Sequence, residues 1–361
     1  MKQFSNALMT WYVEHKRELP WRETRDPYRV WISEIILQQT RVVQGHDYFL
    51  RFMERFPTLQ SLSESLVDDV LKLWQGLGYY SRARNLHQAA CSMAGVFPTT
   101  YAEVRALKGV GDYTAAAICS LAFGLPYAVV DGNVYRVLAR YFGIEDPIDS
   151  TSGKKIFAQL AQQQLEIALT LSPSSVFSSP AGDYNQAIMD FGALQCTPSA
   201  PRCAECPLCE SCTAFAERRV AELPVKARRT KVTEMYLHYI YVRANACTYI
   251  KQRTENGIWQ GLYEFPLIET SKHTSPEEVL DSPEFKAFFV SIENLKRSVF
   301  RVVATDVKHL LSHRTLHVNL YEVQLDKDDV SSFSTYQRIL EKEFEQYAVS
   351  KLIATLYKKI K

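Results

Sequence analysis

The sequence lacks any apolar run of the length that a membrane-spanning helix needs. The first residues, Met1–Ser5, also lack the apolar core of a secretion signal. These two absences predict a protein that stays inside the cell, in the cytoplasm if the source is bacterial, with no membrane partner. In that reducing compartment, crowded cysteines indicate metal binding rather than disulfides.

The net charge is also small, because the chain has 42 basic and 40 acidic residues and therefore a formal charge of +2. This balance neither requires nor excludes a nucleic-acid partner, since a protein can gather its basic residues on one face. Basic clusters occur at residues 82–84 and 226–231, and each one alone is typical of a solvated face or a linker.

The chain has no internal repeat and no low-complexity segment, but its 361 residues exceed what one core usually holds. Helical spacing of apolar residues dominates the first two hundred residues. Strand-like runs appear only later, at residues 235–242, 248–252 and 316–323. We therefore expect a mainly α domain over residues 1–213, a connector over 214–232 and a smaller α+β domain over 233–361.

Local signals predict where some helices begin and end. Asp26 followed by Pro27 has the chemistry of an N-cap and a first helical residue, which predicts a helix over residues 28–39. Residues 63–66 favour the start of another helix, which is expected to end near Gly76.

Five of the eight cysteines fall between Cys196 and Cys212. Cys196, Cys203, Cys206 and Cys212 have the spacing C-x6-C-x2-C-x5-C, which gathers four thiolates in one short loop. Four thiolates suit either a tetrahedral zinc ion or a [4Fe–4S] cluster, and spacing alone does not choose between them. Cys209 lies outside this pattern and is not an expected ligand.

A Gly-x-Gly turn at Gly109 and Gly111 joins two expected helices into a hairpin at about residues 105–124. The unpaired N–H groups at the start of its second helix suit a phosphate. Glycine permits the close backbone approach that a side chain would block. Such contacts position DNA without reading its sequence. Asp131 follows twenty residues after Gly111 and is the expected N-cap of the next helix.

This hairpin and the segment VVDGNVYRVLAR over residues 129–140 resemble the helix-hairpin-helix DNA glycosylase superfamily. The resemblance implies that Asp131 assists the excision of a base. The cysteine loop is similar to that of the endonuclease III and MutY glycosylases. That similarity implies a [4Fe–4S] cluster, which the loop would hold with four ligands: Cys196, Cys203, Cys206 and Cys212.

Two further segments resemble the MutY family, namely WISEIILQQT over residues 31–40 and GLGYYSR over residues 76–82. In that family the glutamate at the place of Glu34 is catalytic. Apolar residues share its helix face at Val30, Trp31 and Leu37. A carboxyl in such surroundings has a raised pKa and stays protonated near neutral pH, as a general acid must.

Tyr113 stands two positions after Gly111, where lyases of the endonuclease III type carry a lysine that forms a Schiff base. A phenol cannot form an imine, so we expect a monofunctional enzyme. The second domain is expected to resemble the Nudix fold that recognises 8-oxoguanine in MutY. It lacks the Arg-Glu-x-x-Glu-Glu core of Nudix hydrolases. Leu311, Ser312 and His313 stand where that family has a Phe-Ser-His loop.

The resemblance thus implies a monomeric adenine DNA glycosylase that acts on double-stranded DNA with adenine opposite 8-oxoguanine, at the nucleoid in a bacterium. Guanine opposite the adenine is a second expected context. Glu34 would protonate N7 of a flipped adenine, and Asp131 would stabilise the oxocarbenium-like sugar or bond to it. The remaining expected roles are a positioned water at Tyr113 and Asn133, the adenine pocket at Trp21, Arg22 and Gln186, a duplex wedge at Gln39 and Tyr79, 8-oxoguanine contacts at Ser312 and His313, and DNA backbone contacts at Gly109 and Gly111.

Three other interpretations stay open on the sequence. One is an endonuclease III-like glycosylase and lyase acting on oxidised pyrimidines, and Tyr113 argues against it. A second is a damage-binding protein without catalysis, and the retention of both Glu34 and Asp131 argues against it. A third is a nucleotide hydrolase of the Nudix type, and the missing hydrolase core argues against it.

Overall fold

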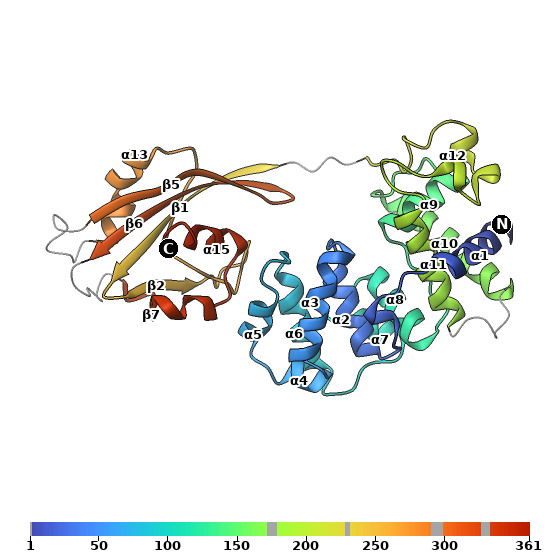
Figure 1. The fold of residues 1–361 in the computed structure, drawn as a ribbon, viewed down its shortest axis with the longest axis horizontal. Coiled ribbons are helices and arrows are strands. Elements are labelled where there is room, and N and C mark those ends of the chain that lie inside the picture. The colour runs from blue at the N-terminus through green and yellow to red at the C-terminus, as the bar shows by residue number, and fades with distance from the viewer. Residues whose placement is uncertain (1, 172–178, 228–231, 290–298, 326–332) are drawn as a thin grey trace. The chain divides into compact units, whose positions relative to one another are not determined.

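The computed structural model describes residues 2–171, 179–227, 232–289, 299–325 and 333–361. The chain divides into two compact units, drawn as a ribbon in Figure 1. The first, here called the helical unit, comprises Met1–Glu64 and Asn85–Arg229. The second, the sheet unit, comprises Ser65–Arg84 and Thr230–Lys361. None of the described helices combines the length and apolar character that crossing a bilayer requires.

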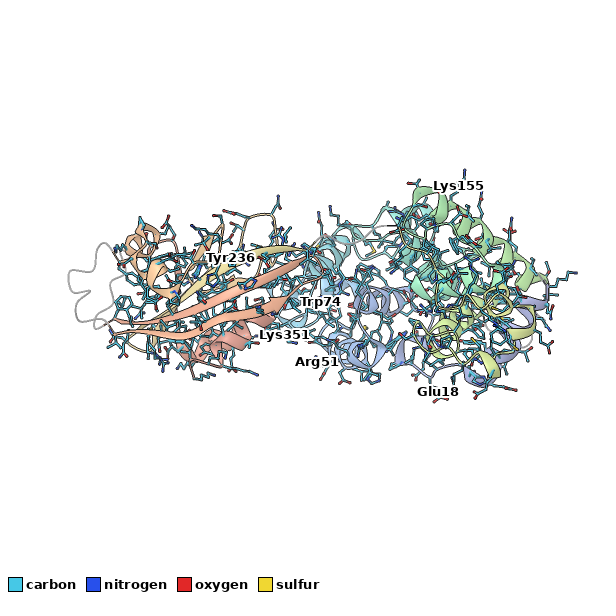
Figure 2. The ribbon with its side chains drawn as sticks, turned by 90° about the horizontal axis from the view of Figure 1, so that it is seen from above. Glu18, Arg51, Trp74, Lys155, Tyr236 and Lys351 are labelled. Carbon is cyan, nitrogen blue, oxygen red and sulfur yellow. The ribbon has the colours of Figure 1, made fainter. Side chains whose placement is uncertain are left out.

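The helical unit consists of α-helices joined by short loops and 3-10 turns. Its elements are α1 (Lys2–His15), η1 (Pro20–Arg22), α2 (Pro27–Leu37), α3 (Val42–Arg55), α4 (Leu59–Ser63), α7 (Tyr101–Ala106), α8 (Asp112–Phe123), α9 (Gly132–Phe142), α10 (Thr151–Leu171), α11 (Pro180–Leu194), η2 (Cys203–Glu205), η3 (Cys209–Ser211) and α12 (Thr213–Ala216). Helix α6 (Ser81–Ser92) begins in the sheet unit and continues in the helical unit. Long charged side chains such as Lys155 of α10 point into solvent (Figure 2).

Helix α2 begins as the sequence predicts, since the Asp26 carboxylate accepts a hydrogen bond from the N–H of Tyr28 at 3.0 Å. It ends at Leu37 rather than at residue 39, because Gln39 has a positive φ of 56° that a right-handed helix does not allow. The prediction that a helix begins at residues 63–66 was wrong about its starting point. Helix α4 ends at Ser63, and α5 (Val67–Leu73) begins only after Leu66.

Helix α8 lies at the centre of the helical unit and contacts α2, α7 and α11. Its first half is rich in small buried residues, Ala115, Ala116 and Ala117, which let neighbouring helices approach closely. Residues that follow the cysteine loop belong to this unit as well. Ala214 and Leu223 are buried in the same core as α1, α9 and α11. Residues 228–231, which include most of the basic cluster at 226–231, lie outside the described part of the chain.

The sheet unit contains a mixed sheet, which has seven strands in the described residues, in the order β3-β2-β1-β6-β5 with β4 paired to β1 and β7 to β2. Its elements are β1 (Thr233–Ala244), β2 (Cys247–Gln252), β3 (Tyr263–Glu264), β4 (Leu267–Thr270), α13 (Pro276–Asp281), α14 (Pro283–Ala287), β5 (Val299–Leu310), β6 (Arg314–Leu325), β7 (Gln337–Leu340), η6 (Glu341–Gln346), α15 (Lys351–Tyr357) and α5. Strands β1 and β6 are parallel and pair along their full lengths.

Both faces of this sheet are covered. Helix α15 packs with the face that carries Leu316, Val318 and Leu320, while α13 and α14 pack with the opposite face (Figure 1). The sequence predicted alternation of apolar and polar residues in the strand at 316–323, and Asn319 follows this pattern. It is nevertheless buried, because the second face lies under the two helices. The outcome is the smaller domain containing helices and strands that the composition predicts.

Candidate active site

A cavity of about 720 Å³ in the helical unit contains every site residue that the sequence predicts for that unit, apart from the cysteines. Its walls come from η1, α2, the hairpin, α8, the start of α9, and α11. The predicted residues that line it are Trp21, Arg22, Glu34, Gln39, Gly109, Gly111, Tyr113, Asp131, Asn133 and Gln186. Trp21 is 7% exposed, so its ring lies in the wall of the cavity and not on the surface.

Glu34 projects into this cavity from the middle of α2 and is 6% exposed. Burial raises the pKa of this carboxyl to about 7, and the negative charge of Asp131 acts in the same direction. A hydrogen bond with Tyr113 and the charge of Arg22 oppose the rise. The carboxyl is therefore protonated in a large fraction of molecules near neutral pH and is able to donate a proton.

Asp131 reaches the same cavity from the N-cap of α9. Its Oδ1 accepts hydrogen bonds from the N–H groups of Asn133 at 2.9 Å and Val134 at 2.8 Å. The Asn133 side chain donates to Oδ2 at 2.8 Å. Burial raises the pKa of Asp131, but these three donors and the charge of Arg136 stabilise its ionised form. The N-cap interaction that the sequence predicts is therefore present, and it fixes the carboxylate at the cavity wall.

Arg22 is held at the cavity by a buried ion pair that the sequence did not indicate. Its two terminal nitrogens donate to Asp190 of α11 at 2.7 and 2.9 Å. Arg17 forms a second ion pair with the same carboxylate. Burial opposes ionisation of Asp190, but the hydrogen bonds and charges of the two arginines outweigh it and keep its pKa below the usual range. The guanidinium of Arg22 is thus fixed in place rather than free to rotate.

Gln186 also has a fixed orientation. The hydroxyl of Tyr12 donates to its Oε1 at 2.7 Å, so the Nε2 group remains as the donor available to a base in the cavity. Gln186 and Asp190 lie four residues apart on α11 and therefore on one helix face.

The two hairpin glycines differ in whether the fold requires glycine at their positions. Gly109 has a φ of +80°, and a Cβ there would lie 2.8 Å from the Cβ of Asn85, so the fold itself requires glycine. Gly111 has an extended backbone, and a Cβ there would meet nothing within 4 Å. Beside it, the carboxylate of Asp112 accepts a hydrogen bond from Arg105 at 2.5 Å, which neutralises its charge at the turn.

The cysteine loop encloses a second, smaller cavity of about 30 Å³. Five thiols line it, from Cys196, Cys203, Cys206, Cys209 and Cys212. Within the ranges that the structure covers, no three His, Cys, Asp or Glu side chains form a group that could hold a metal ion. Around one zinc ion four thiolates would lie about 4 Å apart. A polynuclear iron–sulfur cluster takes thiolate ligands, and the cysteines that line this cavity supply enough of them.

Arg136 of α9 connects this loop to Asp131 and was also missed by the sequence analysis. Its guanidinium donates to the carbonyl oxygen of Cys196 at 2.7 Å and to that of Gly192 at 2.7 Å. It donates as well to Oδ1 of Asn133 at 2.8 Å, and Asn133 in turn holds Asp131. Arg136 is 8% exposed. The position of Asp131 is therefore coupled to the start of the cysteine loop by direct hydrogen bonds.

Arg140, one helical turn further along α9, contacts the loop itself. It donates to Sγ of Cys196 at 3.4 Å and to the carbonyl oxygen of Thr197 at 2.8 Å. Two arginines four residues apart on one helix are the signal that could have indicated this role, since both face the loop.

The remaining predicted residues belong to the sheet unit. The hydroxyl of Tyr79 donates to Oγ of Ser312 at 2.9 Å, and Oγ of Ser312 lies 3.4 Å from Nδ1 of His313. All three side chains are exposed. Leu311, next to them, packs against the core under α15. The expected wedge residues Gln39 and Tyr79 belong to different units, so only the second lies in this group.

Comparisons with known proteins agree with this architecture. Residues 32–163 match the HhH-GPD superfamily of base excision DNA repair proteins, and residues 238–359 match the NUDIX domain. The chain is 35% identical over 325 residues to an adenine DNA glycosylase of Buchnera aphidicola subsp. Schizaphis graminum, covering 87% of this chain and 86% of that protein.

An adenine DNA glycosylase of Mus musculus is 31% identical over 418 residues, covering 98% of this chain and 77% of that protein. Among solved structures, a thermostable thymine-DNA glycosylase superposes with a TM-score of 0.53 at 29% identity, covering 60% of this chain and 97% of that chain. These likenesses confirm the family and the fold that the motifs predict. The chain belongs to the adenine DNA glycosylase family of base excision repair enzymes.

Proposed function

We propose that the protein removes adenine opposite 8-oxoguanine in double-stranded DNA and leaves the strand uncut. The observation that carries the proposal is the pair of carboxyls in one cavity. Glu34 is buried and has a pKa of about 7, whereas Asp131 accepts three hydrogen bonds that favour its ionised form. Burial raises the pKa of both carboxyls, but Asp131 has three hydrogen-bond donors that oppose the rise, and such a difference in environment is the usual basis for dividing acid and anion roles.

In this mechanism the adenine leaves the base stack and enters the 720 Å³ cavity. Glu34 transfers its proton to N7 of the adenine, which turns the base into a neutral leaving group. The bond between C1′ and N9 breaks, and its electron pair stays with the base. The carboxylate of Asp131 stabilises the positive sugar or bonds to C1′ until water replaces it. Tyr113 and Asn133 position that water.

Recognition of the base rests on donors that the fold holds in place. Tyr12 fixes the amide of Gln186 so that Nε2 donates into the cavity. Asp190 fixes the guanidinium of Arg22, and Trp21 supplies an aromatic wall. Purine nitrogens with lone pairs accept from such donors, whereas a ring N–H would be repelled.

Contacts with the rest of the DNA are assigned to the hairpin and to the sheet unit. At Gly111 the turn is open to an approaching phosphate, since nothing within the protein occupies that space. The exposed polar groups of Ser312 and His313 are available to 8-oxoguanine. Gln39 and Tyr79 wedge the duplex beside it. The enzyme acts on this DNA as a monomer inside the cell.

We further propose that Cys196, Cys203, Cys206 and Cys212 hold a [4Fe–4S] cluster. A bound cluster would tie the end of the helical unit together, and Arg136 connects the start of the loop to Asn133, which bonds to Asp131. A visible absorption band and about four iron atoms per chain are expected. A colourless preparation that contains zinc would contradict this assignment.

The experiment that tests the function uses a duplex with one adenine opposite 8-oxoguanine, sampled with and without hot alkali. Strand cleavage only after alkali is expected, because a monofunctional enzyme leaves an intact abasic site. Nicking without alkali would support a lyase of the endonuclease III type. Tight binding without any product would support a damage-binding protein. A duplex with guanine opposite the adenine is the matched comparison, and slower excision there supports 8-oxoguanine recognition.

A further inference from the structure

Cysteine recurs at every third residue in the second half of the loop, at Cys203, Cys206, Cys209 and Cys212. The N–H of each of the last three donates to the carbonyl oxygen of the cysteine before it, at 3.2, 3.1 and 3.2 Å. These bonds close two one-turn 3-10 helices, η2 and η3, and join them through Cys206, whose backbone is extended. The backbone therefore bonds Cys209 directly to the cysteine before it and to the cysteine after it.

The side chain of Cys209 also lines the small cavity together with the four proposed ligands. Its exposure is intermediate, as theirs is. The loop thus offers five thiols around a space proposed for a group that takes four. Two of the four, Cys206 and Cys212, are joined to Cys209 by backbone hydrogen bonds, whereas Cys196 lies at the other end of the loop.

We propose that Cys209 is a reserve ligand that binds cluster iron when Cys206 or Cys212 does not. This inference rests on the proposed [4Fe–4S] cofactor. The exchange breaks one iron–sulfur bond and forms another. The departing thiolate takes up a proton, and the thiol of Cys209 releases one, so no electron is transferred. The loop has no such reserve for Cys196.

Iron content and visible absorbance of full-length variants test the inference. Cys206→Ser and Cys212→Ser are each compared with the double variant that also carries Cys209→Ser. We expect the single variants to keep about four iron atoms per chain and the double variants to lose them. Cys196→Ser is the control, and it should lose its iron whether or not Cys209 is present. Single variants that lose iron as completely as the doubles would overturn the inference.

Cys209→Ser by itself keeps all four proposed ligands and decides the question if the ligand variants are insoluble. Its iron should be released to a chelator faster than that of the unaltered protein, because no spare thiol rebinds iron at a site that opens. Equal release rates would overturn the reserve role. The unaltered protein separates the two proposals: if it contains no iron, the cofactor assignment fails, whereas iron with equal release rates leaves the cofactor intact.

Discussion

The middle of α2 and the start of α9 each place one carboxyl in the same cavity, but the two helix positions give these carboxyls different hydrogen-bond partners. Backbone N–H groups near Glu34 are already bonded within the helix, so its carboxyl has a hydroxyl from Tyr113 as its hydrogen-bond partner. Asp131 precedes a helix whose first N–H groups have no helical partner, and it accepts two of them. Position along a helix therefore decides how many hydrogen-bond donors oppose the rise in pKa that burial causes at each carboxyl.

Replacing Glu34 with glutamine should have the largest effect on the rate of excision. Glu34→Gln keeps the size of the side chain and removes the proton, so excision should fall about 10²- to 10⁴-fold. Binding of the damaged duplex should be unchanged. Single-turnover excision and a gel-shift titration measure the two effects. A rate close to that of the unaltered enzyme would remove Glu34 from the acid role.

Replacing Asp131 separates charge from capping. Asp131→Asn keeps an N-cap oxygen and loses the charge, so excision should fall about 10²- to 10³-fold. Its unfolding free energy should change by only a few tenths of a kcal/mol. Asp131→Ala should be equally inactive and lose about 1 kcal/mol of stability as well. Denaturant unfolding of the two variants checks this, and an active Asp131→Asn enzyme would leave the capping role alone.

The pH dependence of excision follows from the pKa of about 7 at Glu34. The acid must be protonated, so the single-turnover rate should fall by about tenfold per pH unit above pH 7. A rate that is constant between pH 6 and 9, measured with the same duplex, would contradict the neutral acid.

Stability should depend on the same group. The folded pKa is raised above the unfolded value of 4.5, so the folded state binds this proton more tightly, and Glu34 destabilises it as pH rises from 4.5 through 7. Glu34→Gln should therefore be more stable than the unaltered protein above pH 7, by on the order of 3 kcal/mol. The difference should vanish below pH 4.5. Unfolding curves at pH 4.5 and 8 measure it.

Tyr113→Phe should produce the smallest effect, and it tests what opposes the raised pKa of Glu34. It removes the hydrogen bond that lowers the pKa of Glu34, so the falling limb of the pH profile should move to higher pH by about one unit or less. Tyr135→Phe is the control, because Tyr135 lines the same cavity but does not contribute to the pKa of Glu34. A shift of equal size in both variants would contradict the assigned hydrogen bond.

The sequence predicts the residues of this cavity where a motif carries them, and it misses those that only packing brings together. Glu34, Tyr113 and Asp131 stand in segments with recognisable patterns. Asp190 and Arg136 do not, because charged residues on an amphipathic helix are usually solvated. In the described residues the buried side chains with a formal charge are Glu34, Arg136, Arg140 and Asp190. Glu34 and Arg140 line one of the two cavities, and Asp190 and Arg136 bond to residues that do. Arg136, Arg140 and Asp190 are buried where α9 and α11 pack together.

The sheet unit is less predictable for a different reason. Strand β5 (Val299–Leu310) was missed altogether, although it is twelve residues long. Its pairing with β6 shifts register between Val302 and Ala304 and again between Ala304 and Val307, which destroys the simple alternation that indicates a strand. It also lies at the edge of the sheet, where Val299 and Leu310 are exposed rather than buried. For both reasons the sequence of this strand shows no alternation of apolar and polar residues.

The most direct test of the central claim is the titration of Glu34 itself. Carbon-13 NMR of the protein labelled at the glutamate side-chain carboxyls would identify the Glu34 signal by its loss in Glu34→Gln. The account predicts a midpoint at about pH 7, well above that of the exposed glutamates. A midpoint near 4.5 would show an ionised Glu34 at neutral pH and would contradict the division of roles between the two carboxyls.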